Sequence, residues 1–289
     1  MIANYANELG RKLQDRGSLG LADAAYATAT RLEPDWPTPW FNRGLMAKFR
    51  RRWPECYRFN LKATELDPTF EPAWWNLGIA ATALSDWVVA RRAWWRYGIE
   101  VPLGDGPPDM DLGPVPIRVC PGSQGEVVWC QRLDPARAMI RSIPLPESRH
   151  AYGDILLQDG EPKGHRFLGD HKIPVFNELE IHTPSDWSTF SAELTVPSPE
   201  AAQELRDMTA EGEVIVEDWS TLRILCKQCS EGTPHEHAED TDEGWKPNRL
   251  FGLAATAEPL AAALLDRWRS AGPGRDVGSL VFAFSHPKN

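Results

Sequence analysis

Small and large apolar residues recur with a fixed period through the first third of the chain. Three glycines and three prolines repeat every 34 residues: Gly10, Gly44 and Gly78, and Pro34, Pro68 and Pro102. A period of this length predicts stacked pairs of helices. The glycines let two helices approach closely, and large side chains, here Tyr26, Trp40, Trp74 and Trp94, fill the space between successive pairs. Each proline is expected just beyond the second helix of its pair, because it lacks an amide hydrogen and restricts the residue before it.

The residues around these positions form a recognisable motif. The third copy reads Trp74-x2-Leu77-Gly78-x2-Ala81, followed by Ala90-x3-Trp94. The first copy has Gly10, Ala22 and Tyr26 at the same spacing, and the second has Trp40, Gly44 and Ala63. Residues 3–102 therefore resemble the tetratricopeptide repeat (TPR) family, whose unit is a helix-turn-helix. The second copy departs from the family pattern with Arg43 and Asn60, where bulkier or apolar residues are usual.

The resemblance implies a concave groove that holds a peptide or helix of a partner. By register, the groove would be lined by Asn7, Arg11, Phe41, Asn42, Leu45, Phe49, Trp75, Asn76 and Ile79. Asn42 and Asn76 occupy equivalent positions, where their amides could hold a peptide backbone. The basic residues that clamp a C-terminal carboxylate in chaperone-binding members are not matched, so the groove favours an apolar anchor. Alternatively, Phe41 and Trp75 are buried by later domains of the same chain.

No solvating cap follows the third repeat. The segment "DWVVARRAWWRYG" carries Trp87, Trp94 and Trp95, and a Pro/Gly-rich connector, residues 103–114, comes after it. Pro and Gly at this density predict an extended chain. An uncovered aromatic face would cost several kcal/mol at about 25 cal/mol per Å². We therefore expect the following domain to pack against these tryptophans.

Residues 115–187 have a strand pattern. "EVVWCQRL", "AMIRSI", "YGDILLQ" and "KIPVFNELEI" alternate apolar and polar positions or run apolar with branched side chains, and glycines separate them. This pattern predicts a small antiparallel barrel or sandwich.

Residues 188–289 mix strands and helices. "STFSAELTV", "EVIVEDW", "RLFGLAATA" and "GSLVFAFS" read as strands, and "SPEAAQELRDMTAEG" and "EPLAAALLDRWRSAG" read as helices. Ser198 and Pro199 suit the cap and first position of a helix. The β-α-β, loop, β-α-β order predicts a ferredoxin-like α+β sheet with its helices on one face. The whole chain is thus expected to be α+β and multidomain.

The loop between the two halves of this last domain, residues 226–237, holds a cluster of metal-binding residue types. Cys226 and Cys229 are followed by His235 and His237. Two thiols and two imidazoles within twelve residues suit tetrahedral zinc, and four protein ligands would make the site structural. A redox Cys-x2-Cys pair is less favoured, because such pairs sit at helix N-termini and a polar, turn-like segment follows Cys229. A loop without a ligand remains the third interpretation.

Composition narrows the class of protein. No apolar run approaches the length of a membrane span, the first residues lack a signal-peptide core, and the five cysteines are an odd number, so we expect a cytoplasmic protein. Residues 1–102 contain 14 Lys/Arg and 11 Asp/Glu, whereas residues 103–289 contain 17 and 30. The acidic composition of residues 103–289 argues against nucleic acid as a ligand and is compatible with a basic protein partner.

Signals of catalysis are weak. There is no G-x-S-x-G, phosphate-binding glycine loop or H-E-x-x-H, and the order of the Cys and His residues differs from that of the zinc deaminases. The sequence therefore predicts a non-catalytic, bacterial, protein-binding scaffold, either an adaptor or an immunity protein that neutralises a basic toxin. The alternative is a zinc-containing enzyme with a site between the middle and C-terminal domains.

Overall fold

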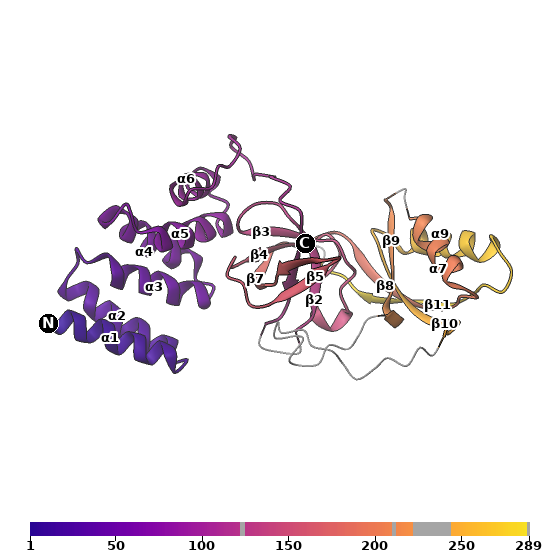
Figure 1. Cartoon of the computed structure of the whole chain (residues 1–289), viewed down its shortest axis with the longest axis horizontal. Coiled ribbons are helices and arrows are strands. Elements are labelled where there is room, and N and C mark those ends of the chain that lie inside the picture. The colour runs from indigo at the N-terminus through magenta and orange to yellow at the C-terminus, as the bar shows by residue number, and fades with distance from the viewer. Residues whose placement is uncertain (122–124, 210–211, 222–243, 288–289) are drawn as a thin grey trace. The chain divides into compact units, whose positions relative to one another are not determined.

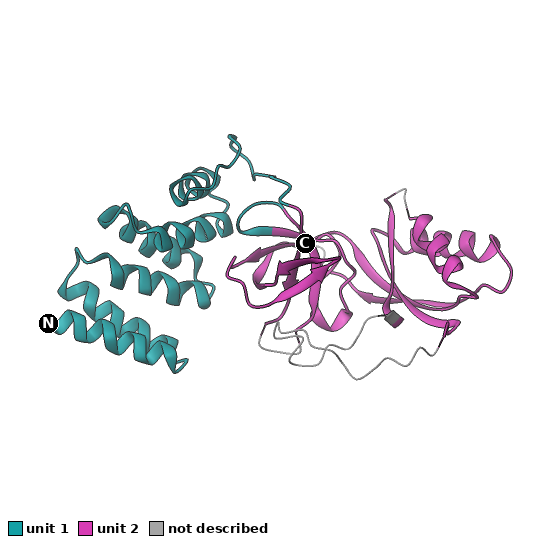
Figure 2. Ribbon diagram, in the orientation of Figure 1, with its two compact units in different colours: residues 1–112, 133–137 teal, residues 113–132, 138–289 magenta. Residues whose placement is uncertain are grey.

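The computed structural model describes residues 1–121, 125–209, 212–221 and 244–287. The chain forms two compact units (Figure 2). Unit 1 comprises residues 1–112 and 133–137, and unit 2 comprises residues 113–132 and 138–289.

Unit 1 contains three successive helical hairpins (Figure 1). The helices are α1 (Ile2–Asp15), α2 (Leu19–Leu32), α3 (Pro37–Phe49), α4 (Trp53–Leu66), α5 (Glu71–Ala83) and α6 (Trp87–Tyr97). Helices α2 and α4 end just before Pro34 and Pro68, as the sequence predicts, whereas α6 ends at Tyr97, five residues before Pro102, with Gly98 as its left-handed cap. Equivalent tryptophans secure the first two of these ends, because Trp40 Nε1 donates to the carbonyl of Pro34 and Trp74 Nε1 to that of Pro68, each at 2.9 Å.

Each hairpin is closed by a glycine that faces a larger side chain of the second helix. Gly10 contacts Tyr26, Gly44 contacts Asn60 and Gly78 contacts Trp94. A Cβ atom at Gly78 would lie 2.6 Å from the Trp94 ring, so this close approach requires glycine. The 34-residue period is therefore a repeated steric relationship.

The two unusual residues of the second repeat have specific partners. Asn60 is fully buried, and its amide donates to the carbonyl of Cys56 at 2.8 Å. Arg43 forms an ion pair with Asp23 at 3.1 Å, and its guanidinium lies 4.0 Å from the centre of the Phe59 ring. Polar side chains thus occupy these packing positions without breaking the repeat.

The tryptophans of α6 do not form the single open face that the sequence suggested. Trp94 is fully buried against Gly78 and Trp75, whereas Trp95 is 65% exposed. Other parts of unit 1 contact α6. Arg91 donates to the carbonyl of Pro102 and to that of Gly106 in the connector, each at 2.7 Å.

A buried arginine from the turn at residues 133–137 stacks on the third tryptophan, since the Arg137 guanidinium lies 4.8 Å from the centre of the Trp87 ring. Arg137 also forms a buried ion pair with Asp134 at 2.7 Å and donates to the carbonyl of Pro108. Of the three tryptophans against which the following domain was expected to pack, Trp87 is contacted by Arg137 from the predicted domain 115–187, whereas Trp94 is buried in its own repeat and Trp95 is exposed.

Unit 2 begins with a closed five-stranded barrel in the order β1-β2-β3-β4-β7. Its strands are β1 (Pro114–Arg118), β2 (Val127–Arg132), β3 (Arg137–Ile140), β4 (Ile155–Gln158) and β7 (Phe176–Thr183), and β5 (His165–Leu168) pairs with β6 (His171–Pro174) as a separate hairpin. The expected barrel is therefore present. One pair differs from the antiparallel expectation, because β1 and β7 run parallel, with Ile117 opposite Phe176 and Arg118 opposite Asn177.

The C-terminal part of unit 2 has the predicted order of strands and helices. Its elements are β8 (Ser188–Thr195), α7 (Pro199–Asp207), β9 (Val214–Asp218), β10 (Asn248–Ala255), α9 (Glu258–Ser270) and β11 (Asp276–Phe284). The strands form one antiparallel sheet in the order β11-β8-β10-β9. Ser198 caps α7 by accepting from the amide of Ala201, and both helices share a core with the sheet around Trp268, Phe251 and Leu253.

The opposite face of this sheet packs on the segment that follows β3. Alternate strand residues Ile215 and Ala254 join Ile143 in a separate apolar cluster. Trp219 Nε1 donates to the carbonyl of Ile143 at 3.3 Å, and the carboxylate of Glu217 accepts from the amide of the same residue. Barrel and sheet are therefore joined by a packed and hydrogen-bonded junction.

Candidate functional site

The predicted groove residues lie on the first helix of each repeat, and they differ in exposure. Phe49 is 45% exposed, while Phe41 and Leu45 are half-buried on the same helix, α3. Phe41 packs against Phe70, with ring centres 5.1 Å apart. These three residues form the apolar stripe of α3 that a partner could contact.

The groove residues of α5 are more enclosed. Trp75 is half-buried between Trp94 and Tyr97, with ring centres 5.1 and 4.8 Å away, and Ile79 is fully buried. Asn76 is also buried, and its side-chain oxygen accepts from the ammonium of Lys48 at 3.0 Å. On α5 these side chains are thus already held by unit 1.

Two other predicted residues have partners within the repeats. The amide of Asn42 donates to the side-chain oxygen of Asn7 at 2.9 Å, which links α3 to α1. Arg11 is exposed and pairs with Glu8 at 3.0 Å and Asp15 at 3.5 Å. A peptide that used Asn42 would need to share its amide or displace Asn7.

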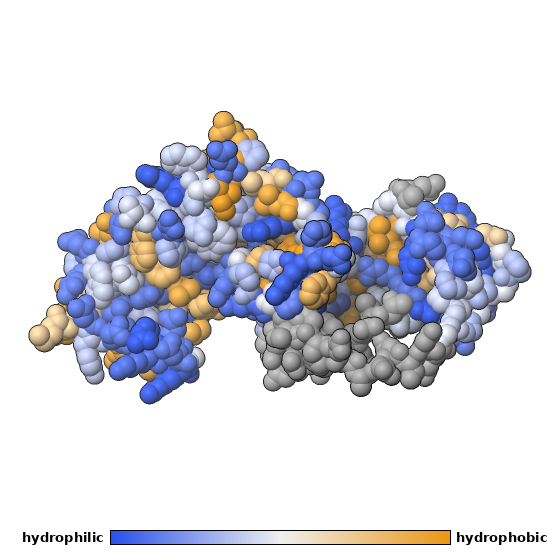
Figure 3. Space-filling view, viewed as in Figure 1, coloured by the Kyte–Doolittle hydropathy of each residue, from blue (hydrophilic) through white to orange (hydrophobic). Residues whose placement is uncertain are grey.

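The surface of unit 1 carries exposed apolar side chains in several places (Figure 3). Phe49 on α3 and Trp95 on α6 are exposed aromatic residues of unit 1, with exposed fractions of 45% and 65%. The four residues of the predicted zinc loop, Cys226, Cys229, His235 and His237, lie outside the described residues.

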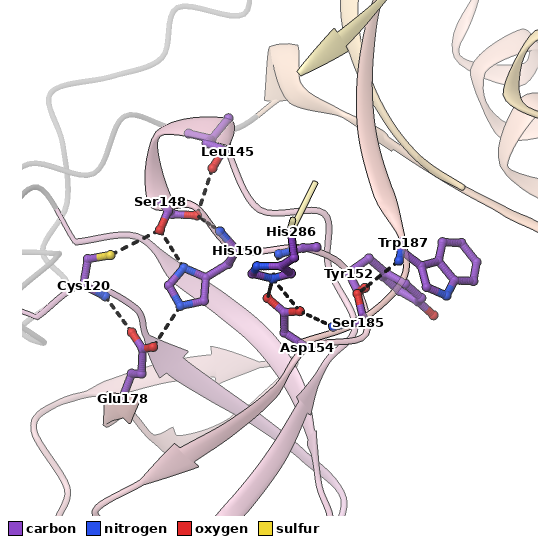
Figure 4. Close-up of polar contacts among 11 residues, drawn as sticks. Cys120, Leu145, Ser148, His150, Tyr152, Asp154, Glu178, Ser185, Trp187 and His286 are labelled. Atoms are coloured by element: carbon purple, nitrogen blue, oxygen red, sulfur yellow. Dashed lines mark hydrogen bonds and ion pairs between the residues drawn. The ribbon is translucent and has the colours of Figure 1, made fainter. Parts of the chain in front are cut away.

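A different cluster of metal-ligating residue types stands at one end of the barrel. Cys120 follows β1, His150 follows the short helix η1 (Pro146–Ser148), and Glu178 lies on β7. Their ligand atoms all lie within 4.8 Å of one another. His150 and Glu178 are buried, whereas Cys120 is half-buried. Figure 4 shows Cys120 and His150 both linked to Ser148, and Glu178 linked to His150 and to the backbone of Cys120.

Hydrogen bonds fix the orientation of each member. His150 Nδ1 lies 2.7 Å from the carbonyl oxygen of Ser148, and Nε2 lies 2.9 Å from Glu178 Oε1. The second carboxylate oxygen of Glu178 accepts from the backbone amide of Cys120 at 2.9 Å. The thiol of Cys120 donates to the same Ser148 carbonyl at 3.3 Å.

The electrostatics of the cluster raise the proton affinity of the His150 imidazole. Burial by itself lowers the pKa of His150, but the hydrogen bond and the negative charge of Glu178 raise it, and the net pKa is above its ordinary value. Nearby, burial raises the pKa of Glu126 to about 7, although its carboxylate accepts from the amide of Leu145. This end of the barrel therefore gathers charged groups away from water.

One stretch of the sequence contains residues of this cluster, although it matches none of the motifs considered above. The stretch "PLPESRHAYGD" holds Ser148, His150 and Asp154, three polar residues that the structure places in hydrogen-bonded contacts. Cys120 and Glu178 are 58 residues apart in the chain, so no local spacing links them to this stretch.

Several solved TPR domains resemble the chain over about a third of its length. The first TPR of Spaghetti (RPAP3), solved with an HSP90 peptide, is 21% identical over 33% of this chain and 76% of that one, with a TM-score of 0.32. The TPR2B-domain:pHsp70 complex of yeast Sti1 is 23% identical over 34% of this chain and 78% of that one, with a TM-score of 0.32. The Sgt2 TPR domain from Aspergillus fumigatus is 22% identical over 33% and 63%, with a TM-score of 0.32.

No protein-family model and no curated protein sequence matches the chain. The helical hairpins and their 34-residue period give the first third the helix-turn-helix architecture of a TPR array. A β-barrel and an antiparallel α+β sheet follow it. Among the residues that the structure describes, no helix is both long and apolar enough to span a membrane.

Proposed function

We propose that the chain is a non-catalytic protein-binding scaffold whose TPR array contacts a partner through the apolar stripe of α3. One observation carries this proposal: Phe49 is 45% exposed beside the half-buried Phe41 and Leu45, on the helix that faces the groove in this repeat family. A large aromatic side chain that remains accessible beside a pre-packed apolar surface is the usual composition of a binding hot spot.

The chemistry of the stripe favours an apolar anchor in the partner. Two of the similar TPR structures are complexes, one with an HSP90 peptide and one with pHsp70. This chain lacks the basic clamp for a C-terminal carboxylate, so we propose an apolar segment as its ligand in place of a chain terminus.

Residues 103–289 are proposed to provide a second binding surface. Their excess of Asp and Glu over Lys and Arg would attract a basic partner and speed association. A TPR scaffold joined to an acidic surface suits an adaptor, or a bacterial immunity protein that neutralises a basic toxin. The proposal of an adaptor or an immunity protein rests on this excess of acidic residues.

Two structural proposals accompany the function. The β-α-β-β-α-β order and the strand order β11-β8-β10-β9 support a ferredoxin-like assignment for residues 188–289. The spacing of Cys226, Cys229, His235 and His237 supports a structural zinc in the loop that connects its two halves.

A matched pair of variants tests the groove. The full-length chain is immobilised, partners are captured from a lysate of the source organism and identified by mass spectrometry, and the affinity of the purified partner is measured by calorimetry. Phe49→Ala is expected to weaken binding about tenfold or more, since a hot-spot side chain contributes about 2 kcal/mol. Trp95→Ala is the control, because Trp95 is an exposed aromatic residue of the second helix of its repeat.

Circular dichroism and thermal melting of the two variants come first. Trp75→Ala is less informative, because Trp75 packs on Trp94 and Tyr97 and its loss disturbs the repeat itself. If folded Phe49→Ala protein binds as tightly as wild type, the binding surface does not include the apolar stripe of α3.

A further inference from the structure

We propose that Cys120, His150 and Glu178 form a binding site for a divalent transition metal ion of the zinc type. The site uses none of the residues of the predicted zinc loop around Cys226, and it goes beyond the scaffold function. It rests on the hydrogen-bond geometry of the cluster, on its mixture of sulfur, nitrogen and oxygen donors, and on the elements that hold it.

The hydrogen bonds of His150 create a requirement for positive charge. A carbonyl oxygen can only accept, so the ring nitrogen that lies 2.7 Å from Ser148 O, Nδ1, must carry a proton. In the neutral imidazole, Nε2 is then an acceptor. It faces a carboxylate oxygen of Glu178, another acceptor, at 2.9 Å. Two acceptors at this distance require either a shared proton or a metal ion between them.

The third member of the cluster favours the metal. The sulfur of Cys120 and the ligand atoms of His150 and Glu178 all lie within 4.8 Å of one another. Zinc binds thiolate sulfur at about 2.3 Å and imidazole nitrogen or carboxylate oxygen at about 2.0–2.2 Å, so its ligand atoms lie about 3–4 Å apart. Small side-chain movements would bring the three donors to that separation. A thiolate, an imidazole and a carboxylate together are a donor set that suits zinc and its neighbours in the first transition row.

The surrounding structure supplies the outer contacts that metal sites need. The Nδ1 hydrogen bond to Ser148 fixes the ring orientation and leaves Nε2 for the ion, which is the usual arrangement for a ligating histidine. The amide of Cys120 orients Glu178 by donating to its second oxygen. Cys120 adopts a left-handed backbone conformation, with φ of 49°, which turns the chain sharply after β1. The ligands are therefore held by the backbone as well as by one another.

The burial of the ligands indicates how an ion would enter. His150 and Glu178 are 3% and 6% exposed, while Cys120 is half-buried. An ion would reach the site from the side of the thiol. Three protein ligands leave a fourth position, which water or a ligand group can occupy.

The test uses Co²⁺ as a spectroscopic substitute for zinc and the full chain in reduced form. Because the loop around Cys226 is itself a predicted metal site, the reference protein carries Cys226→Ser and Cys229→Ser. Titration with Co²⁺ is expected to show one ion per chain and a thiolate-to-cobalt charge-transfer band. Adding Cys120→Ser should remove that band and lower the affinity about a hundredfold or more, since even outer contacts change metal affinity about 10- to 100-fold.

Controls separate ligation from loss of the fold. Cys130→Ala removes a buried thiol from β2 of the same barrel and should leave the band unchanged. His150→Gln should weaken binding as Cys120→Ser does. If the reference protein does not fold, the wild-type chain replaces it, and Cys120→Ser must then lower the Co²⁺ stoichiometry by one. Folded reference protein that takes up no Co²⁺, or binding that Cys120→Ser leaves intact, would overturn the proposal and leave an imidazolium–carboxylate pair.

Discussion

The carboxylate of Asp154 accepts a hydrogen bond from His286 Nε2 at 2.9 Å, although 132 residues separate the two in the chain. Asp154 is fully buried, and it also accepts from the backbone amides of Ala151 and Ser185 (Figure 4). One carboxylate therefore holds together the entry to β4, the link before β8 and the segment after β11. The end of the chain that follows the sheet is thus bound to the barrel.

His286→Ala is expected to lower the free energy of unfolding by about 1–2 kcal/mol, because it removes a hydrogen bond to a buried carboxylate. Urea denaturation of the full chain measures this. His171→Ala is the control, since His171 is an exposed residue of β6. Equal stability of the two variants would show that the contact with Asp154 contributes little.

The glycines of the repeats offer a second matched pair. Gly78→Ala should destabilise unit 1 by about 1–3 kcal/mol, because the new methyl group would lie 2.6 Å from the Trp94 ring. Gly20→Ala introduces the same methyl group in α2 with no atom within 4 Å, and its higher helix propensity should stabilise by up to about 1 kcal/mol. Thermal melting followed at the helix signal distinguishes them. A melting temperature raised by Gly78→Ala would contradict the steric account of the repeat.

Two Asp-x-x-Arg ion pairs of equal length differ in burial. Asp134 and Arg137 are 1% and 4% exposed at their side chains, whereas Asp266 and Arg269 are 65% and 48% exposed, and each pair is 2.7 Å apart. Asp134→Ala should cost about 3–5 kcal/mol, because it leaves Arg137 buried beside Trp87 without its charge partner. Asp266→Ala should change stability by less than about 1 kcal/mol. Chemical denaturation of both variants checks the difference.

Two buried carboxylates make stability depend on pH. Burial raises the pKa of Glu126 and of Glu217 to about 7, from an ordinary value of 4.5. Between those pH values the folded chain binds more protons than the unfolded chain. The free energy of unfolding should therefore fall as the pH rises from about 4.5 to 7 and should change little from this cause above it.

Glu126→Gln and Glu217→Gln remove this titration. Each variant is expected to be more stable than wild type at pH 8 by about 1–3 kcal/mol, and to match it near pH 4.5. Glu193→Gln, at an exposed position of β8, is the control. Denaturation curves at several pH values test the effect, and a gain of the same size at pH 4.5 and pH 8 would assign it to something other than proton binding.

The sequence by itself determined the features whose contacts are local in the chain. Gly78 meets Trp94, and Gly44 meets Asn60, within one hairpin, so a 34-residue period encodes the packing directly. The strands and helices of residues 188–287 were also predictable, because alternation and helix caps such as Ser198 are local patterns. The exposure of Trp95 and the burial of Trp94 were not, since both fall on one short helix whose rotation depends on its neighbours.

Only the tertiary structure brought Cys120 to His150 and Glu178. The decisive contact is the parallel pairing of β1 with β7, which sets Arg118 opposite Asn177 and so carries Cys120 to the amide contact with Glu178. The sequence pattern predicted antiparallel strands here, and that was wrong for this pair. Alternation of apolar and polar residues identifies a strand, but it does not specify the strand's partner or direction. Closure of the barrel brings together Cys120 and Glu178, which are 58 residues apart in the chain. Contacts at this separation cannot be predicted from local sequence patterns.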